Sequence, residues 1–322
     1  MPVSPSRKTV SQSAGRPSVR MLTIDTESAG QRVDNYLIRV CKGVPKSHIY
    51  KAIRGGEVRV NKGRVQADYR LAPGDVLRVP PLRLPAPGER PRVPPQVFPV
   101  VYEDDALMVI DKPAGVAVHG GSGVSFGVIE QMRAARPEAR LLELAHRLDR
   151  ETSGLLIIAK QRKALVALHD MMRESAGRKL YQALVAGDWV NERQHIRKPL
   201  LKWLTADGER RVKVDPQGKP AHTIVTCLKR YGRYTLVQAE LRTGRTHQIR
   251  VHLASCGHPI VGDDKYGADA VREHFAQLGF RRMFLHAAGL ELPHPLTGEP
   301  LAFQAPLPAA CADLLQLLEQ DK

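Results

Sequence analysis

The sequence predicts an α+β fold with two parts of unequal size. From residue 100 onward, apolar runs alternate with turn signals, and segments of strand and helix periodicity are mixed without regular βαβ order. A proline-rich stretch separates this larger part from a smaller N-terminal part. We therefore expect a small module of helices and strands, followed by a larger domain in which helices flank a sheet.

The first 20 residues are predicted to be a flexible basic tail. They contain Lys, Arg and several Ser but no acidic residue, and they lack the apolar stretch of a signal peptide. No other stretch approaches the roughly 18 consecutive apolar residues of a membrane span. We therefore expect a protein that does not enter a membrane.

Residues 21–79 are predicted to form a module of two helices followed by short strands. Apolar residues at i, i+3, i+4 and i+7 predict the first helix, and these are Val33, Tyr36, Leu37 and Val40. Ser47 is a candidate cap for a second helix, which is expected to end at Gly55 and Gly56. Alternating valines on both sides of residues 61–63 predict a hairpin.

Positive charge is concentrated in this module. Residues 32–80 contain 11 Lys or Arg and four Asp or Glu. Lys46, Lys51 and Arg54 lie on the predicted second helix, where they suit contacts with phosphates. The segment RVDNYLIRV…PKSHIYKAIRGGEVRVNKGRV resembles the S4 RNA-binding domain, which implies that these three residues contact RNA. A solvated basic face is the alternative.

The boundary between the two domains is predicted at residues 80–98. Eight prolines occur between residues 80 and 99. Proline at this density cannot continue a helix or a central strand, so we expect a semi-rigid, extended linker.

Residues 99–322 are predicted to form the second domain. Strands are expected at 106–112, at 154–160, where the apolar run is continuous, and at 235–242, where apolar and polar residues alternate. Two amphipathic helices are predicted by apolar residues on one face, namely Leu165, Leu168 and Met172, and Cys311, Leu314, Leu315 and Leu318.

Asp149 is the first candidate for catalysis. It lies in the segment HRLDRETSGLLIIAK, in a polar turn just before the apolar run. A carboxylate in this place is anchored on a rigid strand. Arg147 and Arg150 flank it, and nearby cations favour the ionised form that acts as a nucleophile or a base. From the spacing alone, a surface loop with local ion pairs explains this pattern better.

A second segment, at residues 243–267, is rich in hydrogen-bond donors. The alternation in HQIRVHL predicts a strand that carries Gln248, Arg250 and His252 on one face. His247, His252 and Cys256 do not have the tight spacing of metal ligands, so we expect no metal site.

The larger domain resembles the RluA-type pseudouridine synthase family from about residue 98 to 305. The motifs that carry the resemblance are HRLD with TSG, DKPAGVAVH, GRTHQIRVH…GHPI.GD..YG, and FLHAAGLELPHP. The resemblance implies a largely antiparallel mixed sheet flanked by helices. It also implies an isomerase that converts uridine to pseudouridine in RNA without a cofactor. The family has more than one member with an S4 domain, and residues 200–221 of this sequence resemble one of these members more than another.

The resemblance assigns a role to several residues. Asp149 matches the catalytic aspartate, Tyr181 a tyrosine that stacks on the target base, and Arg250 the basic partner of the aspartate. Ile249 matches an aliphatic residue beneath the tyrosine, and Arg147 an arginine that holds the place of the flipped nucleotide. Ile249 and Arg147 are therefore expected to bind substrate or RNA. The same is expected of His146, Lys46, Lys51 and Arg54.

The overall charge agrees with an RNA partner. The formal net charge is +16 and the sequence pI is about 9.9. None of the four cysteines forms a CxxC pair, which fits a reduced cytosol. We expect a cytoplasmic monomer that acts on 23S ribosomal RNA, or on a pre-ribosomal large-subunit particle.

Two other functions remain possible from the sequence. One is a non-catalytic ribosome-assembly factor that only binds RNA, because composition fits it equally well. The other is a glycoside hydrolase with paired carboxylates, such as Asp149 with Glu151 or with Asp263 and Asp264.

Overall fold

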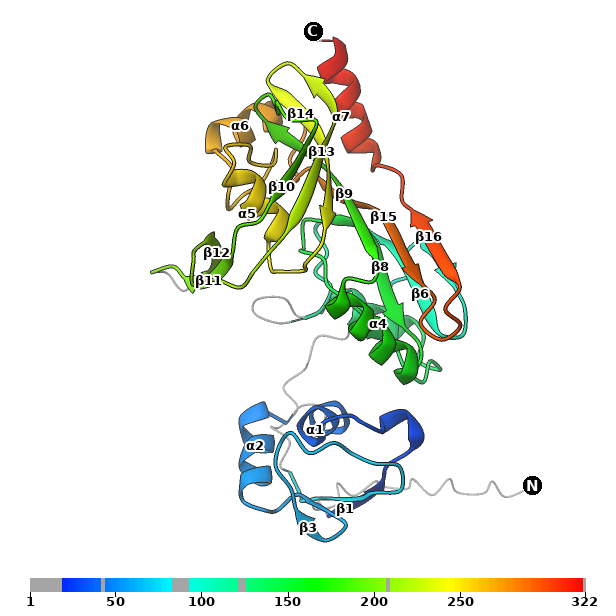
Figure 1. The fold of residues 1–322 in the computed structure, drawn as a ribbon. Helices are drawn as coiled ribbons and strands as arrows, with labels where there is room; N and C mark the ends of the chain where they lie inside the picture. Colours follow the sequence, from blue (N-terminus) through cyan, green and yellow to red (C-terminus); the bar gives the residue numbers. More distant parts are fainter. Residues whose placement is uncertain (1–18, 42–43, 83–92, 121–125, 207–208, 321–322) are drawn as a thin grey trace, which may run out of the picture. The chain divides into compact units, whose positions relative to one another are not determined.

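A computed structural model describes residues 19–41, 44–82, 93–120, 126–206 and 209–320. The chain divides into two compact units, residues 1–91 and 92–322, each of which is described by itself (Figure 1). Most of the predicted basic tail and of the predicted proline-rich linker lies outside the described residues.

The N-terminal unit consists of a four-stranded antiparallel sheet and two α-helices. The strand order is β1-β4-β2-β3. The elements are β1 (Arg20–Thr23), the 3-10 helix η1 (Thr26–Ser28), α1 (Val33–Val40), α2 (Lys46–Arg54), β2 (Arg59–Val60), β3 (Gly63–Arg64) and β4 (Val76–Val79). One apolar core joins both helices to the sheet, through residues such as Leu37, Ile49 and Leu77.

The structure confirms the two predicted helices and the predicted hairpin of this unit. It differs from the prediction at the start of β1 and at the start of α2. Asn61 and Lys62 have φ values of 49° and 68°, as expected for the tight turn of a two-residue hairpin. Strand β1 begins at Arg20, inside the predicted tail, because it pairs with β4, which is distant in sequence. The proposed cap at Ser47 is wrong: α2 begins at Lys46 after Pro45, and no side chain caps it.

The C-terminal unit is built on one large sheet with the strand order β10-β13-β14-β9-β15-β8-β6-β5. Strand β16 also pairs with β15, β7 pairs with β8, and β11 and β12 form a separate hairpin. The pairing of β15 with β8 is parallel and the other pairings are antiparallel. The structure therefore confirms the predicted α+β class with a mixed, largely antiparallel sheet.

The bounds of the twelve strands, in chain order, are as follows. They are β5 (Val100–Glu103), β6 (Leu107–Lys112), β7 (Glu143–Leu144), β8 (Ser153–Ala159), β9 (Arg178–Ala186), β10 (Arg193–Ile196), β11 (Leu200–Leu204), β12 (Arg210–Val214), β13 (Thr223–Tyr231), β14 (Tyr234–Leu241), β15 (Leu285–Pro293) and β16 (Pro300–Gln304).

Helices cover both faces of this sheet. They are α3 (Val128–Ala135), α4 (Arg162–Glu174), α5 (Gln248–Ala254), α6 (Asp269–Gln277) and α7 (Ala309–Gln320). Leu156 and Ile158 of β8 share a core with α3 and α5, whereas Leu155 and Ile157 share another core with α4. Strand β8 is buried on both faces, which explains its continuous apolar run.

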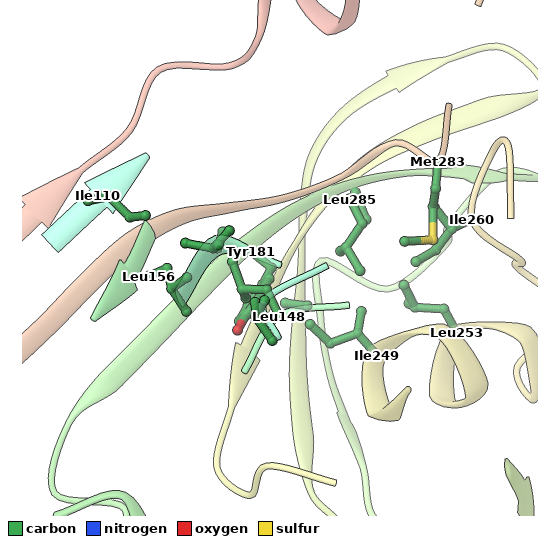
Figure 2. Packing of buried hydrophobic residues seen from close by; sticks show 14 of the residues in the cluster. Ile110, Leu148, Leu156, Tyr181, Ile249, Leu253, Ile260, Met283 and Leu285 are labelled. Atoms are coloured by element: carbon green, nitrogen blue, oxygen red, sulfur yellow. The ribbon is translucent and has the colours of Figure 1, made fainter. Parts of the chain in front are cut away.

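The predicted strand in HQIRVHL is wrong, because residues 248–254 form helix α5. Ile249 and Leu253 point from this helix toward the sheet (Figure 2), and Val251 belongs to a second apolar cluster. The side chains of Gln248, Arg250 and His252 are buried as well. Because this helix is covered on every side, it has no solvent-exposed polar face. Its apolar and polar residues therefore alternate without helical periodicity.

Among the helices of the described residues, none is long and apolar enough to cross a lipid bilayer.

Candidate active site

Asp149 lies in the turn that connects β7 to β8. The backbone N–H of Thr152 donates to the Asp149 carbonyl at 3.1 Å, and the Asp149 side chain is 30% exposed. The turn is fixed where it enters β8, because Gly154 has φ +107° and a Cβ at this position would lie 2.3 Å from the Ala287 carbonyl oxygen. Only glycine allows the parallel pairing of β8 with β15 at this distance. The catalytic candidate therefore stands on a buried, rigid strand.

The side chain of Lys112 also fixes this turn. Its side chain is fully buried at the end of β6, and its Nζ donates to the carbonyls of Pro113 (2.7 Å), Val116 (2.8 Å) and Arg150 (3.2 Å). Burial lowers the pKa of Lys112 to about 7, although the carboxylates of Glu151 and Asp149 oppose this shift. The three acceptors match the three donors of an ammonium group, so Lys112 ties the 113–116 turn to the residue next to Asp149.

Replacing Lys112 with Met should destabilise the protein by about 2–4 kcal/mol, because it removes the three hydrogen bonds that a fully buried Nζ donates to backbone carbonyls. Thermal or urea unfolding of the full chain measures the change. Lys163→Met, at an exposed position of α4, is the control and should stay within about 0.5 kcal/mol of the parent. Equal stability of the two variants would show that the Lys112 bonds do not hold the turn.

Arg250 is the basic partner of Asp149. Its Nη1 lies 3.5 Å from Oδ2 of Asp149. Its other donors are fixed: Nε donates to Oδ2 of Asp263 at 2.7 Å, and Nη2 donates to Oδ1 of Asp263 at 2.6 Å and to Asp264 at 2.9 Å. The Arg250 side chain is 4% exposed and that of Asp263 is fully buried. The bidentate pair holds the guanidinium in one orientation toward Asp149.

The charges of this cluster stabilise one another. Burial alone would lower the pKa of Arg250 and raise that of Asp263, because it penalises both charged forms. Their mutual hydrogen bonds outweigh burial, so the pKa of Arg250 is raised and that of Asp263 is lowered. Both groups stay charged at neutral pH, which keeps a fixed cation next to the Asp149 carboxylate.

Tyr181 and Ile249 meet in the core beneath the site. Tyr181 lies on β9, is 6% exposed, and packs in the same apolar cluster as Leu148 and Ile249 (Figure 2). Burial raises the pKa of Tyr181, and the charge of Asp149 raises it further. The Tyr181 hydroxyl is therefore protonated, and the structure brings tyrosine, aspartate and arginine to one place. The stacking role of Tyr181 remains a prediction.

Arg147 and His146, in contrast, face different surroundings. Arg147 is exposed beside Asp149, where it can meet a phosphate or a base. Nε2 of His146 accepts the backbone N–H of Ile157 at 3.1 Å, and burial lowers the pKa of His146 to about 3. This neutral ring attaches the turn to β8, so its geometry favours a structural role over the predicted RNA contact.

Three residues of the site were not assigned by the sequence reasoning: Asp263, His247 and Tyr266. Nε2 of His247 lies 3.9 Å from Oδ2 of Asp149, and the ring of Tyr266 stacks under Arg250 at 5.1 Å. Asp263 and Tyr266 lie in GD..YG, the end of a motif that carries the family resemblance, and this motif was the available signal. Within the described residues, no cluster of three or more His, Cys, Asp or Glu is arranged to hold a metal ion.

The predicted RNA-binding residues of the N-terminal unit lie on one face of α2. Lys46, Lys51 and Arg54 are exposed, whereas Ile49 and Ile53 are buried in the core. The structure therefore presents the three cations together to solvent, as a contact with phosphates requires.

Comparison with known proteins defines the class. The family model for RNA pseudouridylate synthase matches residues 106–255, and the model for the S4 domain matches residues 31–77. With the full-length relatives described next, these matches show that the chain belongs to the RNA pseudouridylate synthase family and carries an S4 domain. It is an isomerase, which excludes the glycoside hydrolase and the non-catalytic factor as alternatives.

Several relatives of similar length are named ribosomal large subunit pseudouridine synthase C. The chain is 50% identical over 311 residues to that of Pasteurella multocida (strain Pm70), which covers 95% of each chain. It is 49% identical over 314 residues to that of Escherichia coli (strain K12), or 94% of this chain and 97% of the relative. Residues 200–221 favour synthase C over synthase D, the other S4-bearing member of the family. The names of these relatives agree with that prediction.

Solved structures show the same fold over about two thirds of the chain. Human RNA pseudouridylate synthase domain containing 4 has a TM-score of 0.57 and 25% identity, over 69% of this chain and 93% of that chain. Human RNA pseudouridylate synthase domain containing 1 has a TM-score of 0.55 and 27% identity, over 69% of this chain and 95% of that chain.

Proposed function

We propose that this enzyme isomerises specific uridines to pseudouridine in 23S ribosomal RNA of the large subunit. The observation that carries the proposal is the carboxylate of Asp149, paired with a fixed guanidinium at the mouth of a buried strand and close to Tyr181. The names of the full-length relatives support the ribosomal target.

The chemistry needs few groups. The bond from uracil N1 to ribose C1′ breaks, the base rotates, C5 joins C1′, and C5 then loses its proton while N1 gains one. The target atoms are hidden in stacked RNA, so the uridine must leave its stack, at a cost of a few kcal/mol. Asp149 attacks C1′ or removes the C2′ proton, and Arg250 orients its carboxylate. Tyr181 is proposed to stack on the base.

Mapping pseudouridines in ribosomal RNA tests this function. A strain that lacks the gene should lose pseudouridine at specific 23S positions, and the purified enzyme should restore it in 23S RNA from that strain. An unchanged 23S map together with lost modification in another RNA would refute the proposed substrate.

The S4 domain is proposed to bind RNA through α2. Replacing Lys46, Lys51 and Arg54 together with Ala should weaken binding to 23S RNA about tenfold to a hundredfold, and reduce the slope of log K against log salt by about 2–3. Turnover at saturating RNA should remain close to that of the parent, because the catalytic unit is untouched.

Filter-retention measurements at several salt concentrations give both the affinity for 23S RNA and the slope of log K against log salt. Arg70→Ala is the control, since this residue of the same unit lies outside α2 and its Nη1 donates to the Gly30 carbonyl. An unchanged salt slope in the triple variant would exclude α2 as the phosphate contact.

The state of the enzyme and of its substrate is also a proposal. A cytoplasmic monomer that modifies the RNA in a pre-ribosomal large-subunit particle fits an enzyme with its own RNA-binding domain. Light scattering gives the mass of the enzyme. Comparing turnover on free 23S RNA with turnover on large-subunit precursors separates the two substrates.

A further inference from the structure

His247 occupies a place beside Asp149 for which the proposed mechanism gives no role. It immediately precedes α5 and has φ 53° and ψ 21°, which is uncommon for a residue with a Cβ. The side chain of Gln248 fixes this loop: its Oε1 accepts the N–H of Arg245 at 3.0 Å, and its Nε2 donates to the His222 carbonyl at 3.0 Å. The fold thus maintains a left-handed residue at the edge of the active site.

The Nδ1 atom of His247 faces Tyr266. The two atoms Nδ1 and Tyr266 Oη are 2.7 Å apart, and the same hydroxyl accepts the backbone N–H of Val212 at 3.0 Å. The hydroxyl proton therefore needs an acceptor, and Nδ1 is the acceptor within reach. Burial raises the pKa of Tyr266, so the hydroxyl keeps this proton. The imidazole then carries its own proton on Nε2.

The Nε2 atom of His247 faces the catalytic carboxylate. It lies 3.9 Å from Oδ2 of Asp149, the same oxygen that Arg250 approaches at 3.5 Å. Both contacts are longer than a good hydrogen bond, as is common before substrate binds. No hydrogen bond to Oδ1 of Asp149 is found among the described residues. The two donors thus approach the same carboxylate oxygen, Oδ2.

The ring is neutral in this setting. Burial lowers the pKa of His247, the carboxylates of Asp149 and Asp263 oppose the shift, and the cations of Arg250 and Lys265 add to it. A neutral donor orients the carboxylate without taking its charge, whereas a second cation would weaken it as a nucleophile or base.

We propose that His247 is a positioning residue for Asp149, and that Tyr266 fixes its Nε2–H tautomer so that it donates to Oδ2 of the carboxylate when uridine is bound. The inference rests on the proposed function of Asp149. It adds a hydrogen-bond donor, fixed in one tautomer, from the loop that precedes α5. It also gives a role to a histidine with a left-handed backbone at this position.

The tautomer can be read directly from the imidazole ¹⁵N shifts of the full-length protein near neutral pH. We expect a protonated Nε2 and a bare Nδ1, and we expect Tyr266→Phe to lose this preference. A protonated Nδ1 in the parent would overturn the inference. This readout does not depend on activity.

Kinetics tests the role in the reaction. Asn adopts the left-handed conformation more readily than most residues, and its amide reaches toward Tyr266 but is too short for Asp149. His247→Asn should lower kcat on 23S RNA about tenfold to a hundredfold, while KM stays within about twofold.

The matched control is His274→Asn, at an exposed histidine of α6. A kcat for His247→Asn equal to that of the control, or a loss seen only in KM, would overturn the positioning role. Failure of the proposed function is distinguishable, because the parent enzyme would then form no pseudouridine in 23S RNA.

Discussion

Replacing Asp149 with Asn is expected to reduce pseudouridine formation at least about 10⁴-fold while RNA binding stays within about twofold. Asn keeps the size of the side chain but lacks the negative charge that attacks C1′ or takes the C2′ proton. Binding survives, because the side chain is 30% exposed and no core packing depends on it. Single-turnover assays on 23S RNA and a binding isotherm measure the two effects.

Glu151→Gln is the matched control for this experiment. Its side chain is also 30% exposed, it lies two residues from Asp149, and it pairs with the exposed Arg150. We expect turnover within about threefold of the parent, since such exposed pairs contribute at most about 1 kcal/mol. Appreciable turnover in Asp149→Asn would contradict the assignment, and so would an equal loss in both variants.

Replacing Asp263 with Asn is expected to destabilise the enzyme by about 3–5 kcal/mol and to lower Tm by about 10 °C. The change leaves the guanidinium of Arg250, which is 4% exposed, without its bidentate partner. It also weakens the bonds that Asp263 accepts from the backbone N–H groups of Lys265 and Tyr266. Turnover should fall as well, because Arg250 is then free to turn away from Asp149.

Asp264→Asn is the control for Asp263→Asn, since this carboxylate contacts the same guanidinium but is 57% exposed. An exposed pair of this kind contributes about 0–1 kcal/mol. Calorimetry or urea unfolding measures both variants. If they are equally stable, the buried pair does not hold the site together.

Asp263 also predicts a pH dependence of stability. Its pKa in the folded protein is lowered below the unfolded value of about 3.9. Its contribution is therefore fully present above that unfolded value, and it is lost as the pH falls through the folded pKa. Urea unfolding of the parent should weaken progressively below about pH 5, and Asp263→Asn should show a shallower acid slope. Parallel slopes would rule out this linkage.

Several parts of this protein follow directly from local sequence. The apolar run at 154–160 predicts β8, because a strand buried on both faces has no polar alternation to maintain. Helix α4 and helix α7 follow from apolar residues on one face, because their other face is solvated. Motifs around Asp149 and Arg250 predict the enzyme class, which the relatives confirm.

Local pattern fails where an element is covered on all sides. Helix α5 has buried polar residues among its apolar ones, and their hydrogen-bond partners come from distant segments, as with Arg250 and Asp263 or His252 and Thr223. A sequence window cannot show that such partners exist, so the alternation in HQIRVHL resembles a strand.

The sequence by itself determined the fold class, because this depends on periodicity, and its resemblance to known families predicted the S4 domain and the residues of the catalytic motifs. Only the tertiary structure decided which atoms meet. Asp149 and Arg250 are 101 residues apart, and the orientation of the guanidinium depends on Asp263. The left-handed residue His247 likewise precedes Gln248, whose Nε2 donates to the distant carbonyl of His222 at 3.0 Å. Such contacts form only when distant segments pack, since no local preference specifies them.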